Sequence, residues 1–301
     1  MYAVIGASGN TGRVVASTLL ARGEKVRVIG RNARRLAGLV EKGAEAVVAD
    51  AGDPPAITKA FRGVRVVYLM IPPNPTHPHV REDQERVSSA LAAAVQNAGV
   101  EYAVVLSSIG ADKPENTGPV VGLHNLEQKL NEVGALKAIY LRAGYFMENL
   151  FAQVGIIQKL GVGGGPLRGD LKVPMISTQD IGAAAAEHLL KLDFAGKQAR
   201  ELLGERDLTY REVASVVGKA ISQPSLSYVQ FPPAQIKPAL IQAGMSAAMA
   251  GLILEMSGAL NSGHMAALEP RSEQNTTGTS IEKFVAEQFA SRFTGMAAGG
   301  S

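Results

Sequence analysis

The feature that most constrains this chain is a glycine-spaced turn between a short apolar run and a helical pattern. Tyr2–Ile5 is apolar and β-branched, as expected for a buried parallel strand. Gly6, Gly9 and Gly12 follow at intervals of three, and the apolar spacing of residues 14–20 predicts a helix. A second β-branched run completes a strand–turn–helix–strand unit. The free N–H groups at the start of such a helix bind a pyrophosphate, so the sequence predicts a dinucleotide site.

Two departures from the commonest dinucleotide pattern bear on the choice of cofactor. The glycine spacing is one residue longer than G-x-G-x-x-G. The second strand ends at Gly30-Arg31, where an acidic residue would bind a ribose 2′-hydroxyl. The guanidinium of Arg31 matches a 2′-phosphate instead, which favours NADP(H) over NAD(H). Arg34 and Arg35 follow, and we expect Arg35 to contact the cofactor while at least one of the two lies on a solvated helix face.

Composition describes a compact globular chain and excludes several kinds of site. Of the 301 residues, 46% are hydrophobic and 19% are charged, which is typical of a folded protein. The net charge of +3, without a long basic run, predicts no nucleic-acid partner. Without cysteine there are no disulfides, thiolate metal sites or cysteine nucleophiles, and we expect no metal. The first strand begins at Tyr2 and leaves no room for a signal peptide, so we expect a cytoplasmic protein.

Alternating patterns predict an α/β fold with a Rossmann-type, doubly wound parallel sheet. Strand-like runs continue at 26–29, 46–48, 65–70, 102–106 and 136–141, and helical patterns alternate with them at 33–42, 54–61, 79–98 and 122–133. Near-continuous apolar strands separated by helices indicate a sheet covered on both faces. Asp53-Pro54 predicts an N-cap followed by proline at the first helical position. Ligands bind beyond the carboxyl ends of such strands, so the functional residues are expected there.

After residue 145 this rhythm breaks, which predicts a smaller α/β C-terminal substrate lobe. We expect an NADP-binding Rossmann domain over 1–155, a mainly substrate-binding lobe over 156–293, a return to the Rossmann sheet at about 172–203, and a flexible tail over 294–301. The glycine-rich segment 161–165 predicts a flexible loop, either a mobile lid or a turn. Capping boxes are predicted at 209–212 and 279–282. The uncharged stretch 239–254 is too short to span a membrane and predicts a helical pair that lines a pocket.

Residues at the strand ends are candidates for the cofactor and substrate sites. Asp50 ends the third strand, where its carboxylate would accept a hydrogen bond from an adenine amino group or, alternatively, form a turn. The residues predicted to bind cofactor are Gly6, Ser8, Gly9, Asn10, Thr11, Gly12, Arg31, Arg35, Asp50, Ile71, Pro72, Ser107, Ser108, Gly144, Tyr145 and Phe146. Those predicted to contact substrate are Pro73, His124, Phe146, Asn149 and Met245.

The catalytic group is less defined because the usual proton donor is missing. A short-chain carbonyl reductase protonates the forming alkoxide with the tyrosine of Tyr-x-x-x-Lys, and no tyrosine here is followed four residues later by lysine. General acid catalysis contributes about 10²–10⁴-fold, so an unactivated ketone would be reduced slowly. The catalytic candidates are Ser107, His124 and Tyr145. The ordinary pKa of a histidine suits a proton donor near neutral pH. His124 would therefore hold the nicotinamide ribose or donate a proton, unless it is an exposed helix residue. Glu127 and Lys129 are interpreted as solvated.

The segment after the sixth strand would place aromatic rings beside the reacting groups. Gly144 would let the backbone pass close to the nicotinamide, with Tyr145 and Phe146 flanking its ring or a flat substrate. Asn149 is either a recognition residue or an ordinary helix residue. Met245, together with Met249 and Met256, either forms an adaptable apolar pocket or packs in the core.

Together these motifs resemble a known family. GASGNTGR, IGR, the absent Tyr-x-x-x-Lys, LRAGYFMEN and KVPMISTQDIG are similar to the NmrA-like, atypical short-chain dehydrogenase/reductase group, nearest to its NAD(P)H azoreductase and quinone oxidoreductase branch. The resemblance implies a Rossmann domain, a small substrate lobe and an NADPH preference that depends on the position of Arg31. Members of the group divide between reductases of quinones, azo dyes or similar electrophiles and non-catalytic NADP sensors.

The function expected from residues and resemblance is hydride transfer from NADPH to a small aromatic or conjugated substrate. A conjugated acceptor delocalises the incoming charge, so water can supply the proton and the absent tyrosine matters less. The alternative is an NADP(H)-sensing regulatory protein of the NmrA type, and a nucleotide-sugar epimerase or dehydratase is a third, weaker hypothesis. We expect a monomer or homodimer with no membrane partner.

Overall fold

A sheet of seven parallel strands forms the centre of the computed structural model, which describes residues 1–298. The strand order is β3-β2-β1-β4-β5-β6-β10, and every neighbouring pair is parallel. The strands are β1 (Tyr2–Ile5), β2 (Val26–Gly30), β3 (Glu45–Val48), β4 (Val66–Leu69), β5 (Tyr102–Ser108), β6 (Lys137–Ala143) and β10 (Lys197–Leu202). The chain winds outward from β1 to β3, returns to β4 beside β1, and continues to the other edge. This order confirms the doubly wound Rossmann fold, and its winding reverses between β1 and β4.

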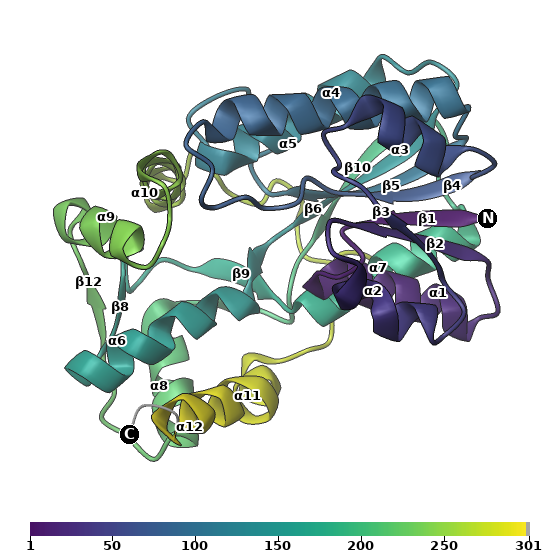
Figure 1. Ribbon diagram of the computed structural model, residues 1–301. Helices are drawn as coiled ribbons and strands as arrows, with labels where there is room; N and C mark the ends of the chain where they lie inside the picture. The colour runs from purple at the N-terminus through teal and green to yellow at the C-terminus, as the bar shows by residue number, and fades with distance from the viewer. Residues whose placement is uncertain (299–301) are drawn as a thin grey trace.

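Helices cover both faces of this sheet (Figure 1). One face carries α1 (Asn10–Ala21), α2 (Ala33–Val40) and α7 (Thr178–Lys191), and the other carries α3 (Pro54–Phe61), α4 (Val80–Ala98) and α5 (Val121–Asn131). Strand side chains alternate between the two cores: Val4 packs with α1 and α7, whereas Ala3 and Ile5 pack with α3 and α4. Each fully buried Val, Leu or Ile contributes about 1.5–3 kcal/mol, so the two cores hold the sheet rigid.

The second lobe has its own core and lies beyond the carboxyl ends of the large sheet (Figure 1). Its sheets are small, with orders β11-β9-β7 and β12-β8. The remaining elements are η1 (Gly118–Val120), β7 (Tyr145–Phe146), η2 (Met147–Ala152), α6 (Gln153–Leu160), β8 (Gly163–Gly165), β9 (Val173–Ile176), β11 (Asp207–Leu208), α8 (Tyr210–Ala220), β12 (Tyr228–Gln230), α9 (Pro233–Gln242), α10 (Ala247–Ser262), α11 (Ile281–Phe284), the π-helical η3 (Val285–Phe289) and α12 (Ala290–Ala298).

Two of the predicted helix caps are confirmed. The side chain of Asp53 accepts a hydrogen bond from the backbone N–H of Ala56, and Pro54 is the first residue of α3. At α8 the hydroxyl of Thr209 accepts from the N–H of Glu212, whose carboxylate accepts from the N–H of Thr209. Such caps satisfy N–H groups that a helix leaves without internal partners.

The third predicted cap, at 279–282, is wrong. Ser280 rather than Thr279 caps α11, and its hydroxyl accepts from the N–H of Lys283. The hydroxyl of Thr279 donates instead to Asp180 in the first turn of α7, at 2.7 Å. A carboxylate is a stronger acceptor than a neutral group, so this tertiary contact takes the threonine and the cap moves one residue along.

The glycine-rich segment predicted as a flexible loop is a buried strand. β8 (Gly163–Gly165) pairs in parallel with β12. The side chain of Gln153 bonds both the N–H and the carbonyl of Gly164, at 2.7 and 2.9 Å. A Cβ on Gly164 would lie only 2.0 Å from the ring of Phe231. The glycine is therefore required for close packing of an aromatic ring, and neither a lid nor a turn is present.

Two further segments differ from the predicted division of the chain. Within 172–203, β10 joins the large sheet beside β6, whereas β9 pairs with β7 and β11 in a separate small sheet. The first part of the predicted flexible tail is helical, because α12 continues through Ala298. The remainder of the predicted tail, 299–301, lies outside the described residues.

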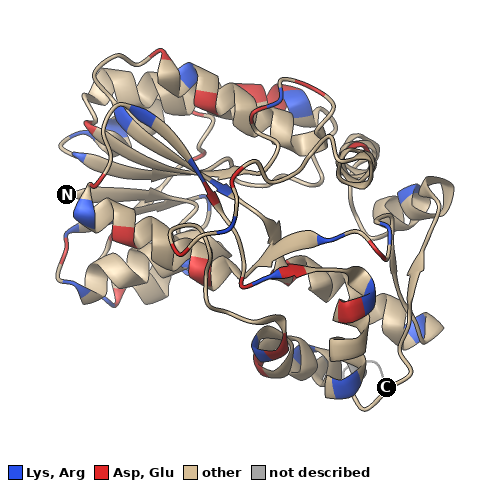
Figure 2. Cartoon of the chain, turned by 180° about the vertical axis from the view of Figure 1, so that it is seen from behind, with Lys and Arg blue, Asp and Glu red and all other residues tan. Residues whose placement is uncertain are grey.

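The uncharged stretch 239–254 forms the end of α9 and the first half of α10. No helix within residues 1–298 is both long and apolar enough to cross a membrane. Seen from behind, α9 and α10 are almost free of charge (Figure 2), carrying only Lys237 and Glu255. Glu255 attaches α10 to the Rossmann domain, since it accepts from Arg81 on α4 and from the N–H of Gly118, each at 3.1 Å.

The packing of α1 against β1 predicts a stability difference between two glycines. A Cβ on Gly12 would lie 2.4 Å from the carbonyl oxygen of Gly6, which is backbone and cannot move aside. We expect Gly12→Ala to destabilise the cofactor-free protein by about 1–3 kcal/mol, the cost of overpacking. Gly38→Ala, at an exposed position of α2 with open space, should instead stabilise it by about 0.5–1 kcal/mol. Urea unfolding measures both changes, and equal effects would contradict the prediction.

Candidate functional site

The glycine turn leaves the start of α1 without a side-chain cap. Gly6 has a φ of +67°, and the N–H of Gly9 donates to the Gly6 carbonyl at 2.8 Å, which closes the turn. Gly9 is the N-cap residue, and no side chain bonds the first N–H groups of α1. These N–H groups have no partner inside the helix, so they are available to an anion at the loop.

A hollow opens beside this turn at the carboxyl ends of β1 to β4. We call it the strand-end hollow; its volume is about 190 Å³. It is lined by Ile5, Gly6, Ser8, Gly9, Ile29, Gly30, Arg31, Arg35, Ala49, Ala51, Met70, Pro72 and Pro73. Six residues predicted for the cofactor are therefore brought together here: Gly6, Ser8, Gly9, Arg31, Arg35 and Pro72. Pro73, predicted for the substrate, lines the same hollow rather than a separate one.

Two arginines on the wall of the hollow have no carboxylate partner among residues 1–298. Arg31 follows β2, and Arg35 lies in the first turn of α2. Within the described residues, neither guanidinium is within ion-pairing distance of an acidic side chain. Arg34 does not line the hollow, and its backbone N–H is bonded by the Asn32 side chain that caps α2. Both neighbouring arginines are exposed, and of the two only Arg35 lines the hollow.

Three residues predicted for the cofactor are not among those that line the strand-end hollow. The hydroxyl of Thr11 is buried and accepts from Tyr68 at 2.9 Å, so only its backbone N–H faces the turn. Ile71 packs against the core shared by the sheet, α3 and α4. Asn10 lines a different hollow, together with Arg13 and Arg292.

Asp50 forms the turn that the sequence offered as one of its two roles. One carboxylate oxygen accepts from the N–H of Gly52 at 2.7 Å, so the residue does form a turn. The side chain is half-exposed, and its neighbours Ala49 and Ala51 line the strand-end hollow. Contact with an adenine amino group therefore stays a prediction compatible with this placement.

A buried ion pair occupies the ends of β5 and β6. Arg142 donates to both carboxylate oxygens of Glu127, at 3.1 and 2.6 Å, and the hydroxyl of Ser107 donates to one of them at 2.6 Å. Ser107 and Arg142 are register partners on neighbouring strands, so both point toward α5, which carries Glu127. Burial opposes the charge of Arg142, but Glu127 raises the pKa of its guanidinium above the ordinary value.

This ion pair contradicts the prediction for Glu127 and engages the side chain of a second candidate, Ser107. Glu127 is not solvated, since only 2% of the residue is exposed. The sequence carries a signal for this burial, because Glu127 lies on the same apolar face of the helix as Leu126 and Leu130. Ser107, predicted for catalysis and for the cofactor, has its hydroxyl engaged under α5. The Ser108 hydroxyl donates to the carbonyl of Ile109 at 3.0 Å.

His124 is oriented by the loop that follows β5. Its Nδ1 lies 2.8 Å from the carbonyl oxygen of Ala111, and the ring is half-buried. A carbonyl only accepts hydrogen bonds, so Nδ1 carries the proton in the neutral ring and Nε2 carries the lone pair. His124 thus presents a single ring nitrogen, Nε2, to any ligand.

The residues after β6 lie between a core of the large sheet and the core of the second lobe. A Cβ on Gly144 would be 2.3 Å from the carbonyl oxygen of Pro174, so close packing on β9 accounts for this glycine. Tyr145 packs edge-on to Tyr210 in the core of the lobe, and burial raises the pKa of its phenol, which the side chains of Tyr210 and Asn149 partly offset. Phe146 packs against the core beneath the large sheet. Their contact with a nicotinamide ring, and recognition by the exposed Asn149, stay predictions.

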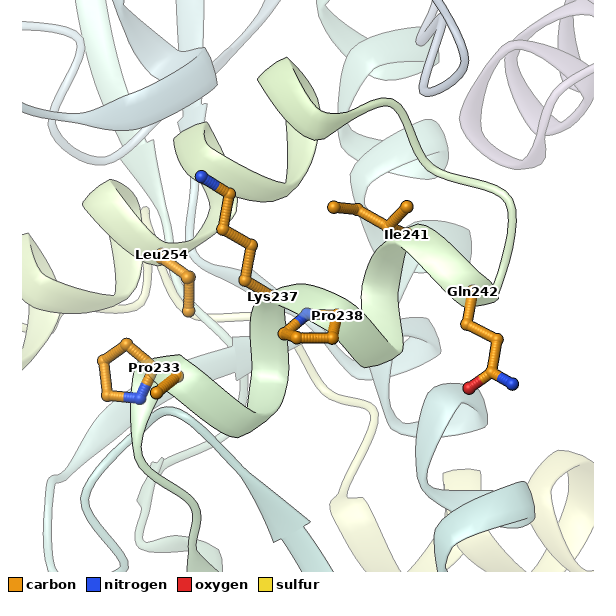
Figure 3. Close-up of a pocket in the computed structure, with 7 residues that line it drawn as sticks. Pro233, Lys237, Pro238, Ile241, Gln242 and Leu254 are labelled. Carbon is orange, nitrogen blue, oxygen red and sulfur yellow. The ribbon is translucent and has the colours of Figure 1, made fainter.

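The methionines of the second lobe favour the packing interpretation. Met245 contacts a small cluster with Val80, Met249 and Leu252, which joins α10 to the start of α4. A groove does open between α9 and α10, with a volume of about 640 Å³, but no methionine lines it. It is lined by Pro233, Ala234, Lys237, Pro238, Ile241, Gln242 and Leu254 (Figure 3). This groove is separate from the strand-end hollow, and no residue is shared between them.

Titratable clusters of the kind that hold metals are not found among residues 1–298: no three His, Cys, Asp or Glu side chains gather there in a suitable arrangement.

The fold and the strand-end hollow together define a dinucleotide-binding protein of the Rossmann class. The profile of the NmrA-like family matches residues 2–285, and the chain belongs to that family. It is 29% identical over 258 residues to an NAD(P)H azoreductase of Xenophilus azovorans, covering 85% of this chain and 86% of that one. It is 30% identical over 224 residues to a (4-alkanoyl-5-oxo-2,5-dihydrofuran-3-yl)methyl phosphate reductase of Streptomyces griseus, covering 74% and 75%.

A solved structure shares the whole architecture. The NADPH-dependent quinone oxidoreductase of Escherichia coli, complexed with NADPH, superposes with a TM-score of 0.79 at 24% identity. The match covers 96% of this chain and all of that one. At this identity the likeness establishes a shared fold.

The buried pair of Glu127 and Arg142 predicts a large stability loss on truncation. Glu127→Ala would leave the mostly buried Arg142 guanidinium, whose side chain is 17% exposed, and the Ser107 hydroxyl without their acceptor, at a cost of about 3–5 kcal/mol. Lys129→Ala is the matched control on the same helix, because its 2.8 Å pair with Glu85 is partly solvated and should be worth about 1 kcal/mol or less. Denaturant unfolding of both variants measures the difference. A loss below about 1 kcal/mol in Glu127→Ala would show that the pair does not stabilise the fold.

Proposed function

We propose that this protein is an NADPH-dependent reductase of flat, electron-poor acceptors such as quinones, azo compounds and imines. The observation that carries the proposal is the pair of guanidinium groups of Arg31 and Arg35, which have no acidic partner in the described part of the chain and lie on the hollow beside the uncapped start of α1. A pyrophosphate would be bound by the N–H groups of the turn, and a 2′-phosphate by the two arginines.

The fit of a dinucleotide is supported by the backbone of the turn itself. Gly9 and Gly12 leave no Cβ between the turn and the helix start, so a phosphate can approach the N–H groups directly. The prolines after β4 and the alanines beside Asp50 form the opposite wall, where the adenosine half would lie. When bound, NADPH supplies a hydride from its nicotinamide ring.

His124 is the residue we assign to the reacting end. Its Nδ1 is held by Ala111, so in the neutral ring Nε2 accepts a hydrogen bond, for example from a ribose hydroxyl. In the protonated ring the same nitrogen donates a proton or a hydrogen bond to a reduced acceptor.

The choice of acceptor is supported by the relatives and by the absent tyrosine. The two curated relatives are named for reduction of an azo compound and of an alkanoyl-oxo-dihydrofuran, both of which are conjugated acceptors. The related fold from Escherichia coli is named a quinone oxidoreductase. A conjugated acceptor spreads the incoming negative charge, so protonation from water suffices when no strong proton donor is placed.

Arginine variants test the cofactor assignment. Arg31→Ala and Arg35→Ala should each raise the dissociation constant of NADPH about tenfold or more, because a charge-assisted bond to phosphate is worth roughly 1.5–3 kcal/mol. NADH binding should change little, and Arg34→Ala, the control on the same helix, should leave both unchanged. Calorimetry or cofactor fluorescence measures the constants. An unaltered NADPH preference in Arg31→Ala would remove the 2′-phosphate assignment.

An acceptor screen tests the activity and the role of His124. With saturating NADPH the protein should oxidise the cofactor in the presence of at least one quinone, azo dye, imine or enone. His124→Ala should lower kcat by about 10²-fold, the lower end of general acid catalysis, since water partly substitutes. His264→Ala is the control, because its Nε2 also bonds the same loop, through the carbonyl of Glu115. NADPH binding with no turnover across the panel would refute the reductase and favour an NADP(H)-sensing regulator.

A further inference from the structure

A cluster of charged and polar side chains links the two loops that form one wall of the strand-end hollow. On α4, Arg86 donates to Asp83 at 2.7 Å, a bond between residues one helical turn apart. The same guanidinium lies 3.5 Å from a carboxylate oxygen of Asp50, after β3. The other oxygen of Asp83 accepts from the side-chain amide of Asn74, after β4, at 3.0 Å. One ion pair therefore reaches both loops.

Both loops contribute directly to the hollow. Asp50 lies between Ala49 and Ala51, and Asn74 directly follows Pro72 and Pro73; those four flanking residues line the hollow. The ion pair stands behind this wall and lines none of it. Only 8% of Asp83 is exposed, whereas the Arg86 side chain is 46% exposed, so the ion pair is sheltered from solvent on its carboxylate side.

The contact between Arg86 and the turn after β3 is unusually close. A Cβ on Gly52 would lie 1.9 Å from one guanidinium nitrogen of Arg86, so the group rests directly on the turn backbone. The N–H of Gly52 also donates to Asp50, to the same oxygen that faces Arg86. Within residues 1–298, the second carboxylate oxygen of Asp50 accepts no hydrogen bond, so it is available to a ligand.

We propose that Asp83 and Arg86 form a clamp that positions Asp50 and the proline wall for the adenine end of NADPH. The clamp sets cofactor affinity without contacting the cofactor or the reacting atoms, so both are positioning residues. The proposal rests on the proposed function, because it needs NADPH in the strand-end hollow.

The clamp stays charged in neutral solution. Burial would raise the pKa of the Asp83 carboxyl, but hydrogen bonds from Arg86 and Asn74 outweigh burial and hold that pKa below its ordinary value. The hydrogen bond to Asp83 raises the pKa of Arg86. His77 is the other charged or titratable neighbour that acts on Asp83.

The test compares two cofactors on Arg86→Met, which keeps an unbranched stem and removes the guanidinium with its charge. The dissociation constant of NADPH should rise about tenfold, the loss expected when a charged hydrogen bond no longer orients a binding group. The kcat at saturating NADPH should stay within about twofold of the parent. Arg86→Lys should restore part of the affinity, because it keeps the charge but not the two-sided reach.

The deamino analogue, with hypoxanthine in place of adenine, separates positioning from general loosening. The parent should prefer NADPH over this analogue, because Asp50 accepts from the adenine amino group, and Arg86→Met should lose most of that preference. An equal loss for both cofactors would overturn the proposed action through Asp50. Arg65→Met, which breaks an exposed 2.9 Å pair with Glu101 at the opposite end of the sheet, is the control and should change neither constant.

A second variant keeps the proposal open to refutation if Arg86→Met folds poorly. Asp83→Asn retains the size of the side chain and should also reduce the preference for NADPH over the deamino analogue. A dissociation constant of NADPH unchanged in both variants, with the parent binding normally, would overturn the clamp and leave the proposed function intact. Failure of the parent to bind NADPH would overturn the proposed function and the clamp together.

Discussion

The contact between Gly12 and the carbonyl of Gly6 is the constraint on which the site depends. It brings α1 so close to the end of β1 that no side chain fits between them. The helix therefore begins directly at the turn, and Gly9 caps it without a side chain that would satisfy its first N–H groups. The closely packed helix therefore presents free N–H donors at its N-terminus. This terminus lies at the carboxyl edge of the sheet, which is where an anion is bound.

Charged groups at this edge are divided between structure and ligand binding. Glu127 pairs with Arg142 under α5, and Asp83 pairs with Arg86 behind the wall of the hollow. These four charged groups bind one another and hold elements of the fold together. Arg31 and Arg35 have no such partner among the described residues and face the hollow. The buried carboxylates of Glu127 and Asp83 need these arginine partners because desolvation is costly, whereas Arg31 and Arg35 remain available to an anionic ligand.

The fold could be predicted from the sequence because its signals are local. The strand at Tyr2–Ile5 and the helix at Pro54–Phe61 were predicted to the residue, since apolar periodicity and the Asp53 cap lie within the segments themselves. The misassigned parts depend on distant residues. Gly164 is fixed by the ring of Phe231, and Thr279 is taken by Asp180. Neither partner can be identified from the neighbouring residues. The local pattern therefore predicts a loop where the structure has strand β8, and it predicts the cap of α11 one residue too early.

The candidate site divides in the same way. By itself the sequence determined the glycine turn, the presence of Arg31 where an acidic residue is usual, and the absence of Tyr-x-x-x-Lys. Each of these depends only on residue type and spacing within a short segment. Only the tertiary structure decided that Arg35 rather than Arg34 lines the hollow, that Ser107 is engaged by Glu127, and that Arg86 reaches Asp50. Those outcomes depend on which side chains from separate elements meet. Packing of the helices on the sheet determines that, and no local pattern encodes it.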